Sequence, residues 1–317
     1  MDKDLNPKTA AALAHCESMI KVGSKSFSLA ARLFSPEVKR AAFFLYGWCR
    51  YCDDLVDQDH PGDTREAREK RLSELIRSTR SSLAGEEQSD PVFTALQYVT
   101  RRYSIPEHYP VELLEGMRMD VRGTRYQSLE ELLLYCYRVA GTVGLMMSHV
   151  MGVSDERALK HAADLGIAMQ LTNIARDLVD DAKQGRIYAP LPWMEEEQIA
   201  PADVACGEHR EKISVLAARL LSAAEAYYRS GDEGLAYLAF RSACAVAAAR
   251  HVYAEIGNLI RLKGAGAWDG RTFTSKRRKL KAVSRGILQV FRSVPGRLSK
   301  PWSQVPIKTV WKFSHAG

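Results

Sequence analysis

The sequence has no long apolar run and little sign of β-structure. Its richest apolar stretch, Ala243 to Ala249, is far shorter than the roughly 18 residues that a helix needs to cross a bilayer. The first residues, Met-Asp-Lys-Asp, lack the apolar core of a signal peptide. Runs of alternating Val, Ile and Thr are nearly absent. We therefore expect a cytoplasmic helical protein, with at most a peripheral contact to a membrane.

Zinc-site cysteines and nucleic-acid motifs are also missing. The six cysteines include one Cys-x-x-Cys pair, Cys49 and Cys52, without a second pair at zinc-site spacing. Their apolar, helical surroundings predict buried, reduced thiols. No zinc finger or RNA-binding motif accompanies the net charge of +7, so nucleic acid is not an expected partner. The densest positive charge, from Lys276 to Arg285, predicts either a solvated helix face or contact with an anionic membrane.

What the sequence does contain is helical periodicity. From Pro36 to Asp59 apolar residues recur at spacings of three and four, after the typical helix start Ser35-Pro36-Glu37. Ser128 and Glu131 predict a capping box before a helix to Val150, and another helix should run from Ser154 to about Ala182. Further helices are expected at about 5–21, 63–83, 90–102, 107–120, 209–230, 234–263 and 275–291. The prediction is an all-α protein with one domain over 1–292 and a basic C-terminal tail over 293–317, either loose or membrane-facing.

Two acidic stripes carry the chemistry. The first acidic stripe is Asp53 and Asp57, which lie on one helix face, about 6 Å apart along the axis. The second acidic stripe is Asn173, Asp177 and Asp181, at i, i+4 and i+8. Ligands that are all oxygen and mostly carboxylate suit magnesium, which takes few protein ligands and is completed by water and substrate phosphates. One stripe could arise by chance on a surface helix, but two within apolar helices favour a metal-diphosphate site.

Arginines stand beside both stripes. Arg50 precedes Asp53, Arg176 precedes Asp177, and Arg186 follows in the turn after Gly185. Guanidinium groups bind phosphate oxygens in bidentate fashion, so these residues are candidates for diphosphate binding. The alternative is local pairing between each arginine and a neighbouring aspartate.

At these residues the sequence resembles the squalene/phytoene synthase family, over most of the chain from about Ser24 to Arg285. Within the family, the sequence is most similar to bacterial phytoene synthases of carotenoid biosynthesis. The segments that carry the resemblance are Ser24–Ser28, Leu45–Asp57, Gly116–Asp120, Tyr135–Gly144 and Gln170–Pro190.

The resemblance implies the isoprenoid-synthase (class I terpenoid synthase) fold, a helical bundle around a central cavity. It implies Mg²⁺, with Mn²⁺ as a substitute, at the catalytic Asp53, Asp57, Asp177 and Asp181 and at Asn173. It also implies diphosphate contacts from Gly23, Ser24, Lys25, Ser26, Tyr46, Arg50, Gln170, Arg176 and Tyr253. The glycines of Ala140–Gly144 would let helices approach or leave room for a prenyl chain, and Met146, Met147 and Met169 would line a tunnel or pack in the core.

The implied reaction is the head-to-head condensation of two geranylgeranyl diphosphates, through prephytoene diphosphate, to phytoene and diphosphate. No NADPH is expected. Either released diphosphate or a tyrosine would act as the base. The rival within the family is a squalene or dehydrosqualene synthase that uses farnesyl diphosphate, and the rival from another class is a non-catalytic helical scaffold.

Overall fold

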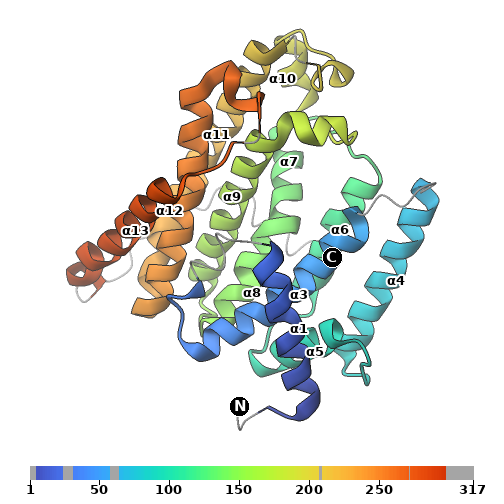
Figure 1. The fold of residues 1–317 in the computed structure, drawn as a ribbon, viewed down its shortest axis with the longest axis vertical. Coiled ribbons are helices and arrows are strands. Elements are labelled where there is room, and N and C mark those ends of the chain that lie inside the picture. The colour runs from blue at the N-terminus through green and yellow to red at the C-terminus, as the bar shows by residue number, and fades with distance from the viewer. Residues whose placement is uncertain (1–4, 24–30, 58–63, 207–208, 271, 298–317) are drawn as a thin grey trace.

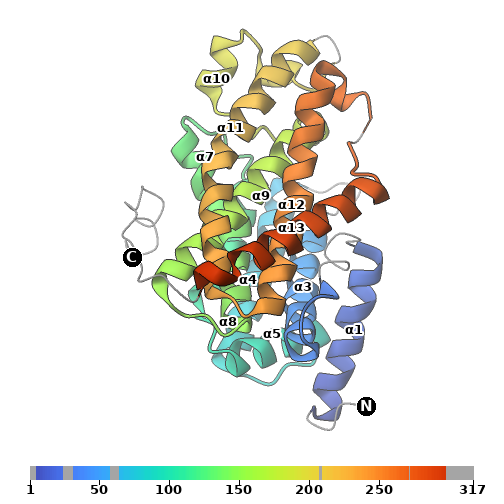
Figure 2. The same ribbon diagram turned by 90° about the vertical axis from the view of Figure 1, so that its left-hand side faces the viewer.

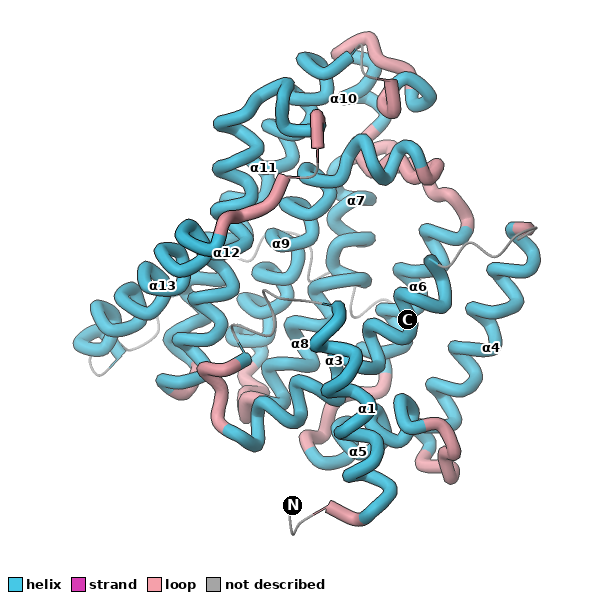
Figure 3. Tube along the Cα trace, viewed as in Figure 1, coloured by secondary structure: helices cyan, strands magenta, loops and turns pink. Residues whose placement is uncertain are grey.

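The computed structural model describes residues 5–23, 31–57, 64–206, 209–270 and 272–297, and over these residues the protein consists of helices and loops without a β-strand (Figure 3). The prediction of an all-α fold is confirmed. No helix in these ranges is both long and apolar enough to cross a bilayer. Of the predicted tail, residues 298–317 lie outside the described part of the chain, as do the predicted diphosphate contacts Ser24, Lys25 and Ser26.

The centre of the bundle is α9 (Glu156–Lys183), the longest helix among those described. It packs against α11 (Arg210–Gly234), α12 (Phe240–Lys263) and α8 (Thr142–Val150) (Figure 1). Its start is fixed locally, because the Asp155 carboxylate accepts a hydrogen bond from the backbone N–H of Arg157. Fourteen of its residues are buried, so α9 presents apolar residues to neighbours on several sides.

The N-terminal half forms the other side of the bundle. Here α1 (Pro7–Gly23), α3 (Pro36–Asp57) and α5 (Pro91–Arg102) pack on one another, beside α4 (Arg65–Ala84) and α6 (His108–Val121). The predicted start of α3 is confirmed, because the Ser35 hydroxyl accepts a hydrogen bond from the Val38 N–H. This cap sets the register of the whole helix and therefore the face on which Asp53 lies.

One predicted helix is interrupted. The expected capping box begins α7 (Leu129–Cys136), with the Ser128 hydroxyl accepting from the Glu131 N–H. After one π-helical turn, Tyr137–Gly141, the chain continues as α8. This turn packs against both α6 and α9, so its wider winding is set by the fit between three elements and not by the local sequence.

Two glycines bring α9 into backbone contact with α8 and with the π-turn. A Cβ added to Gly144 would lie 2.4 Å from the Ala162 carbonyl oxygen, and one added to Gly166 would lie 2.3 Å from the Ala140 carbonyl oxygen. Only glycine permits so close an approach. The contact fixes the position of α9 relative to the π-turn.

The C-terminal helix α13 (Lys276–Arg297) crosses the outer side of α12 (Figure 2). At the crossing Gly286 lies against the backbone of Ala247, where an added Cβ would come within 2.6 Å of the Ala247 carbonyl carbon. Two further short elements were not predicted from the sequence: α10 (Leu191–Glu196) and the 3-10 turn Gly264–Trp268.

Candidate active site

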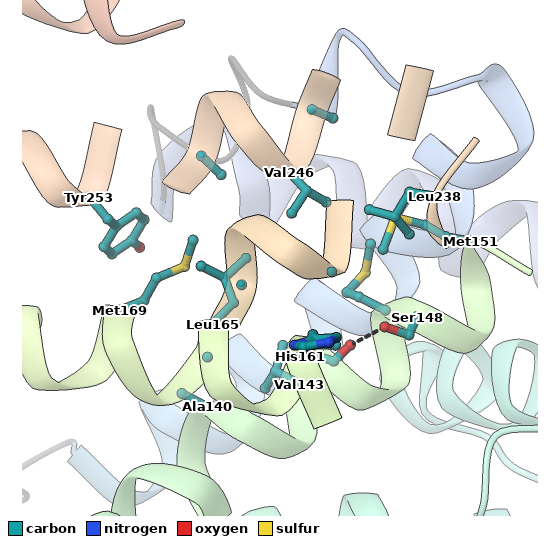
Figure 4. A pocket seen from close by; sticks show the side chains of 18 of the residues that line it. Ala140, Val143, Ser148, Met151, His161, Leu165, Met169, Leu238, Val246 and Tyr253 are labelled. Atoms are coloured by element: carbon teal, nitrogen blue, oxygen red, sulfur yellow. Dashed lines mark hydrogen bonds between the residues drawn. The ribbon is translucent and has the colours of Figure 1, made fainter. Parts of the chain in front are cut away.

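An apolar cavity of about 350 Å³ lies between α8, α9, α11 and α12. Figure 4 shows Val143, Leu165, Met169 and Val246 directed into it. Met147 also lines the cavity, whereas Met146 is fully buried in the core. The volume is within the range of natural ligand sites, and the walls suit a hydrocarbon.

One end of the cavity carries predicted diphosphate-binding residues. Gln170 and Asn173 of α9 and Tyr253 of α12 line it there. Asn173 donates a long hydrogen bond of 3.5 Å from Nδ2 to the Gln170 Oε1. This polar end continues along α9 to Asp177 and Asp181, so the second acidic stripe leads away from the cavity.

Asp177 is paired with its neighbour Arg176. The Arg176 Nε donates to Asp177 Oδ1 at 2.9 Å, and Nη2 donates to the other carboxylate oxygen. Both side chains are mostly buried, with 16% and 17% of their surface exposed. Local pairing, the alternative considered for Arg176, is therefore present in this structure, and it places a guanidinium group at the stripe.

Asp181 has an unfavourable setting for a negative charge. Burial raises the pKa of its carboxyl group to about 7, with Asp177 and Asp120 adding to the rise and Arg186 and Arg176 opposing it. At neutral pH about half of this carboxyl would carry a proton. A divalent cation between Asp177 and Asp181 would remove the repulsion and favour the ionised form.

Beside Asp181 lies a cluster that the sequence did not reveal as part of the site. The Tyr135 and Tyr188 hydroxyls donate to the two carboxylate oxygens of Asp120, at 2.9 and 2.7 Å. The two rings stack with centroids 5.0 Å apart. Burial raises the pKa of Tyr188 well above its usual value, and the charges of Asp120 and Asp181 raise it further.

The cluster joins α6, α7 and the turn after α9. The only signal for it in the sequence was that Asp120, Tyr135 and Tyr188 each fall within a segment that carries the family resemblance.

The first acidic stripe lies at the end of α3. The Asp53 side chain is exposed, and the Asp57 backbone ends the helix while its side chain lies outside the described part. Arg50 pairs with Asp54 and not with Asp53: Nη2 lies 2.6 Å from Oδ1, and Nε donates to Oδ2 at 3.1 Å. This is the i,i+4 pair that helix geometry favours.

Two tyrosines connect the surroundings of the stripes. Burial raises the pKa of Tyr46; Arg50 opposes the rise, and Asp53, Asp54 and Tyr253 add to it. Burial likewise raises the pKa of Tyr253, opposed by Arg176. The electrostatic contacts thus run from Asp53 through Tyr46 and Tyr253 to Arg176, the partner of Asp177.

The remaining predicted residues lie at the edges of this arrangement. Arg186 is half-buried, its charge lowers the pKa of Asp181, and its backbone N–H donates to the Asp181 carbonyl at 2.8 Å. Gly23 ends α1. Among the side chains that are described, no three His, Cys, Asp or Glu residues already converge as a metal site. Magnesium does not need three, since water and phosphate complete its shell.

The sequence is similar to a known family of proteins. Residues 20–281 match the family model Squalene/phytoene synthase. The chain is 44% identical over 292 residues to a phytoene synthase of Pseudescherichia vulneris, covering 90% of this chain and 94% of the relative. It is 42% identical over 301 residues to the 15-cis-phytoene synthase of Pantoea ananas, covering 92% and 97%.

The fold agrees with a solved structure. A crystal structure of a dehydrosqualene synthase in complex with ligand superposes with a TM-score of 0.81 at 28% identity, over 90% of this chain and 98% of that one. The predicted isoprenoid-synthase fold is confirmed by this similarity.

The tyrosine cluster yields a stability prediction. Asp120→Ala would remove the shared acceptor of two tyrosine hydroxyls, and only Tyr135 could then donate to Tyr188, at 3.1 Å, so the free energy of unfolding should fall by about 1–3 kcal/mol. We propose to measure this by urea denaturation at pH 6. Asp120→Asn keeps one acceptor oxygen and should lose less.

Asp180→Ala serves as the control, because the Asp180 side chain is 52% exposed and pairs only at 3.6 Å with Lys183. Its effect should stay within about 0.5 kcal/mol. An Asp120→Ala protein as stable as the wild type would show that the cluster does not contribute as described.

Proposed function

The chain belongs to the squalene/phytoene synthase family, and on this premise we propose that it is a Mg²⁺-dependent phytoene synthase that joins two geranylgeranyl diphosphates head to head. The observation that carries the proposal is an acidic helix stripe that begins at one end of an apolar cavity. Such a site can hold a diphosphate at its polar end and a prenyl chain in its apolar part.

The donor set of the site fits magnesium. Asp53, Asp57, Asn173, Asp177 and Asp181 would supply the oxygen ligands, and Mn²⁺ would substitute. The fit rests on the buried Asp181, whose carboxyl group is disfavoured as an anion until a cation lies beside it and Asp177. When bound, Mg²⁺ supplies Lewis-acid stabilisation for the charge that develops on the departing diphosphate.

The protein's own residues would bind the diphosphate and keep the reaction dry. Arg176, Arg186 and Arg50 would contact phosphate oxygens, together with Tyr46, Gln170, Tyr253 and the segment Gly23 to Ser26. Loss of diphosphate from one substrate gives an allylic cation, which the double bond of the second substrate attacks. Proton loss closes the cyclopropane of prephytoene diphosphate, and a second ionisation with rearrangement and proton loss gives phytoene. The apolar walls exclude water, which would otherwise quench the cations.

The tyrosine cluster contains a candidate for the base. The Tyr188 hydroxyl donates to Asp120 and lies 3.1 Å from the Tyr135 hydroxyl, so Tyr188 would take up a proton from the substrate while passing its own proton to the Asp120 carboxylate. Its pKa responds to Asp181, so it lies close to where the diphosphate would be. Released diphosphate and Tyr188 therefore stand as the two alternatives for proton removal.

The length of the cavity supports a C20 substrate. Its lining extends along α9 from Asn173 to Ala158, which at the α-helical rise corresponds to about 22 Å. An extended chain of carbon atoms advances about 1.2 Å per bond, so four isoprene units span about 19 Å and three about 14 Å. A farnesyl chain would leave the far end unfilled.

The outer face of α13 supports the proposed contact with an anionic membrane. Leu280, Leu288 and Phe291 are 66%, 48% and 56% exposed and recur at helical spacing. Basic residues are exposed next to them at Arg277, Lys281, Arg285 and Arg292. Exposed apolar side chains interleaved with Lys and Arg are typical of helices that lie at the surface of anionic lipid.

The metal ligands can be tested by one substitution and a neighbouring control. Asp177→Asn should lower turnover of geranylgeranyl diphosphate with Mg²⁺ by about a hundredfold or more, because charge on the leaving group loses its stabilisation. Asp180→Asn removes an exposed acid from the same helix and should leave turnover near the wild-type rate. Helix content should be unchanged in both by circular dichroism. Equal activity of the Asp177 variant and the wild type would refute the metal assignment.

The substrate is tested by incubating the protein with Mg²⁺ and either geranylgeranyl or farnesyl diphosphate, without NADPH. The expected product is phytoene from the C20 substrate, identified by mass spectrometry, with little hydrocarbon from the C15 substrate. A C30 hydrocarbon as main product would instead identify a dehydrosqualene synthase. No turnover of either substrate would favour a non-catalytic scaffold.

Vesicle flotation tests the membrane contact. The wild type should float with vesicles that contain anionic lipid and detach at high salt. The bound fraction should fall about tenfold or more for Lys281→Glu with Arg285→Glu, because two charges are reversed, and fall also for Leu280→Ser with Phe291→Ser. Val215→Ser, an exposed apolar residue on α11, is the control. A wild type that stays unbound, or variants that float equally well, would exclude this surface.

A further inference from the structure

His161 is a polar side chain in the apolar wall of the cavity, far from both acidic stripes. It lies on α9 twelve residues before Asn173, a distance of about 18 Å at the helical rise. In Figure 4 it is directed into the cavity, with Leu165 on the side of Tyr253 and with Met151 and Leu238 on the opposite side. The reaction proposed above gives this residue no chemical task.

A chain of hydrogen bonds fixes the imidazole ring. Ser230 donates its hydroxyl proton to Asp164, a residue only 5% exposed, which also pairs with Lys160 at 2.6 Å. The Ser230 oxygen must therefore accept the hydrogen bond of 2.8 Å that joins it to His161 Nδ1. The proton is thereby placed on Nδ1. Burial, and secondarily Lys160, lowers the pKa of His161, in agreement with this assignment.

The ring also has no room to withdraw toward α11. A Cβ added to Gly234 would lie 2.6 Å from the His161 Cβ, so the backbone of α11 is already in contact with this residue. The Tyr237 ring lies beside the imidazole, with centroids 6.0 Å apart. Other walls of the cavity are formed by Met147, Met151 and Met169, whose unbranched side chains adapt to the shape of a ligand. His161 is by contrast a rigid part of the wall.

We propose that His161, held by Ser230 and Asp164, sets the length of the prenyl chain that the cavity accepts. The inference rests on the proposed function. Four isoprene units span about 19 Å from the polar end, which brings the last unit to the level of His161. Beyond it the lining continues along α9 only to Ala158, a further distance of about 4.5 Å. A fifth unit, about 5 Å long, would have to pass the fixed ring and would overfill this remainder.

The test is a competition in which the protein receives C15, C20 and C25 prenyl diphosphates together with Mg²⁺. The measured quantity is the ratio of the products formed, or of the substrates consumed, in that one reaction. His161→Ala enlarges the end of the cavity and should raise consumption of the C25 relative to the C20 substrate about tenfold. His161→Phe fills it and should lower the C20 to C15 ratio by a similar factor. Ratios within one sample do not depend on how much of a variant is folded.

Two further variants separate chain selection from a general structural effect. Ser230→Ala removes the anchor but leaves the imidazole, so it should weaken the preference for C20 over both other lengths. His251→Ala is the matched control, because His251 is also half-buried and hydrogen-bonded, at 2.7 Å to Gln289 Oε1, but is not among the cavity-lining residues. It should keep the wild-type ratios.

The outcomes distinguish the two proposals. If the wild type converts the C20 substrate and both His161 variants keep its ratios, the inference about His161 is wrong and the proposed function stands. If the wild type does not convert the C20 substrate, the proposed function itself fails. If Ser230→Ala keeps a wild-type preference while the His161 variants change it, chain length is set by ring volume without the hydrogen-bonded anchor, which contradicts the proposal as stated.

Discussion

The repulsion between buried carboxylates beside an apolar cavity is the constraint on which the rest of the structure depends. Asp177 and Asp181 lie one helical turn apart, Asp120 is close enough to act on Asp181, and burial disfavours the Asp181 charge. The protein offsets part of this repulsion with Arg176 and Arg186 and with two tyrosine hydroxyls on Asp120. In the proposed function, a divalent cation would relieve the remaining repulsion and would hold an anionic substrate group.

The apolar cavity and the charged end of the site act together. A low-dielectric interior strengthens attraction between a cation and a carboxylate, and it protects a carbocation from water. Both halves are built on α9: its N-terminal half lines the cavity through Leu165 and Met169, and its C-terminal half carries Asp177 and Asp181. The close glycine contacts of α9 with α8 and the π-turn hold this helix in place. Backbone packing therefore sets the distance between the end of the cavity that would hold the prenyl tail and the end that would bind diphosphate. A rigid helix in this position can measure the length of a substrate.

The sequence predicted those features that depend on local interactions. The start of α3 follows from Ser35, as predicted, whereas α9 was expected to begin at Ser154 and is capped one residue later by Asp155; each cap satisfies a backbone N–H group in the first turn of its helix. The i,i+4 spacing placed the acidic residues of each stripe on one helix face. The same i,i+4 spacing also favours the observed pairing of Arg50 with Asp54, which the sequence analysis did not predict.

Features that join distant segments were not predictable in this way. The Asp120 cluster forms only where α6, α7 and the turn at Tyr188 come together in space. No local pattern in the sequence links its three residues. The π-turn at Tyr137–Gly141 and the anchor of His161 on Ser230 likewise depend on neighbouring helices.

The central claim, that the two stripes share divalent ions, is tested most directly by a crystal structure with Mn²⁺ and diphosphate. We expect anomalous peaks at bonding distance from Asp53 on one side and from Asp177 and Asp181 on the other, with the diphosphate between them. Peaks confined to other surfaces, or none at these aspartates, would contradict it.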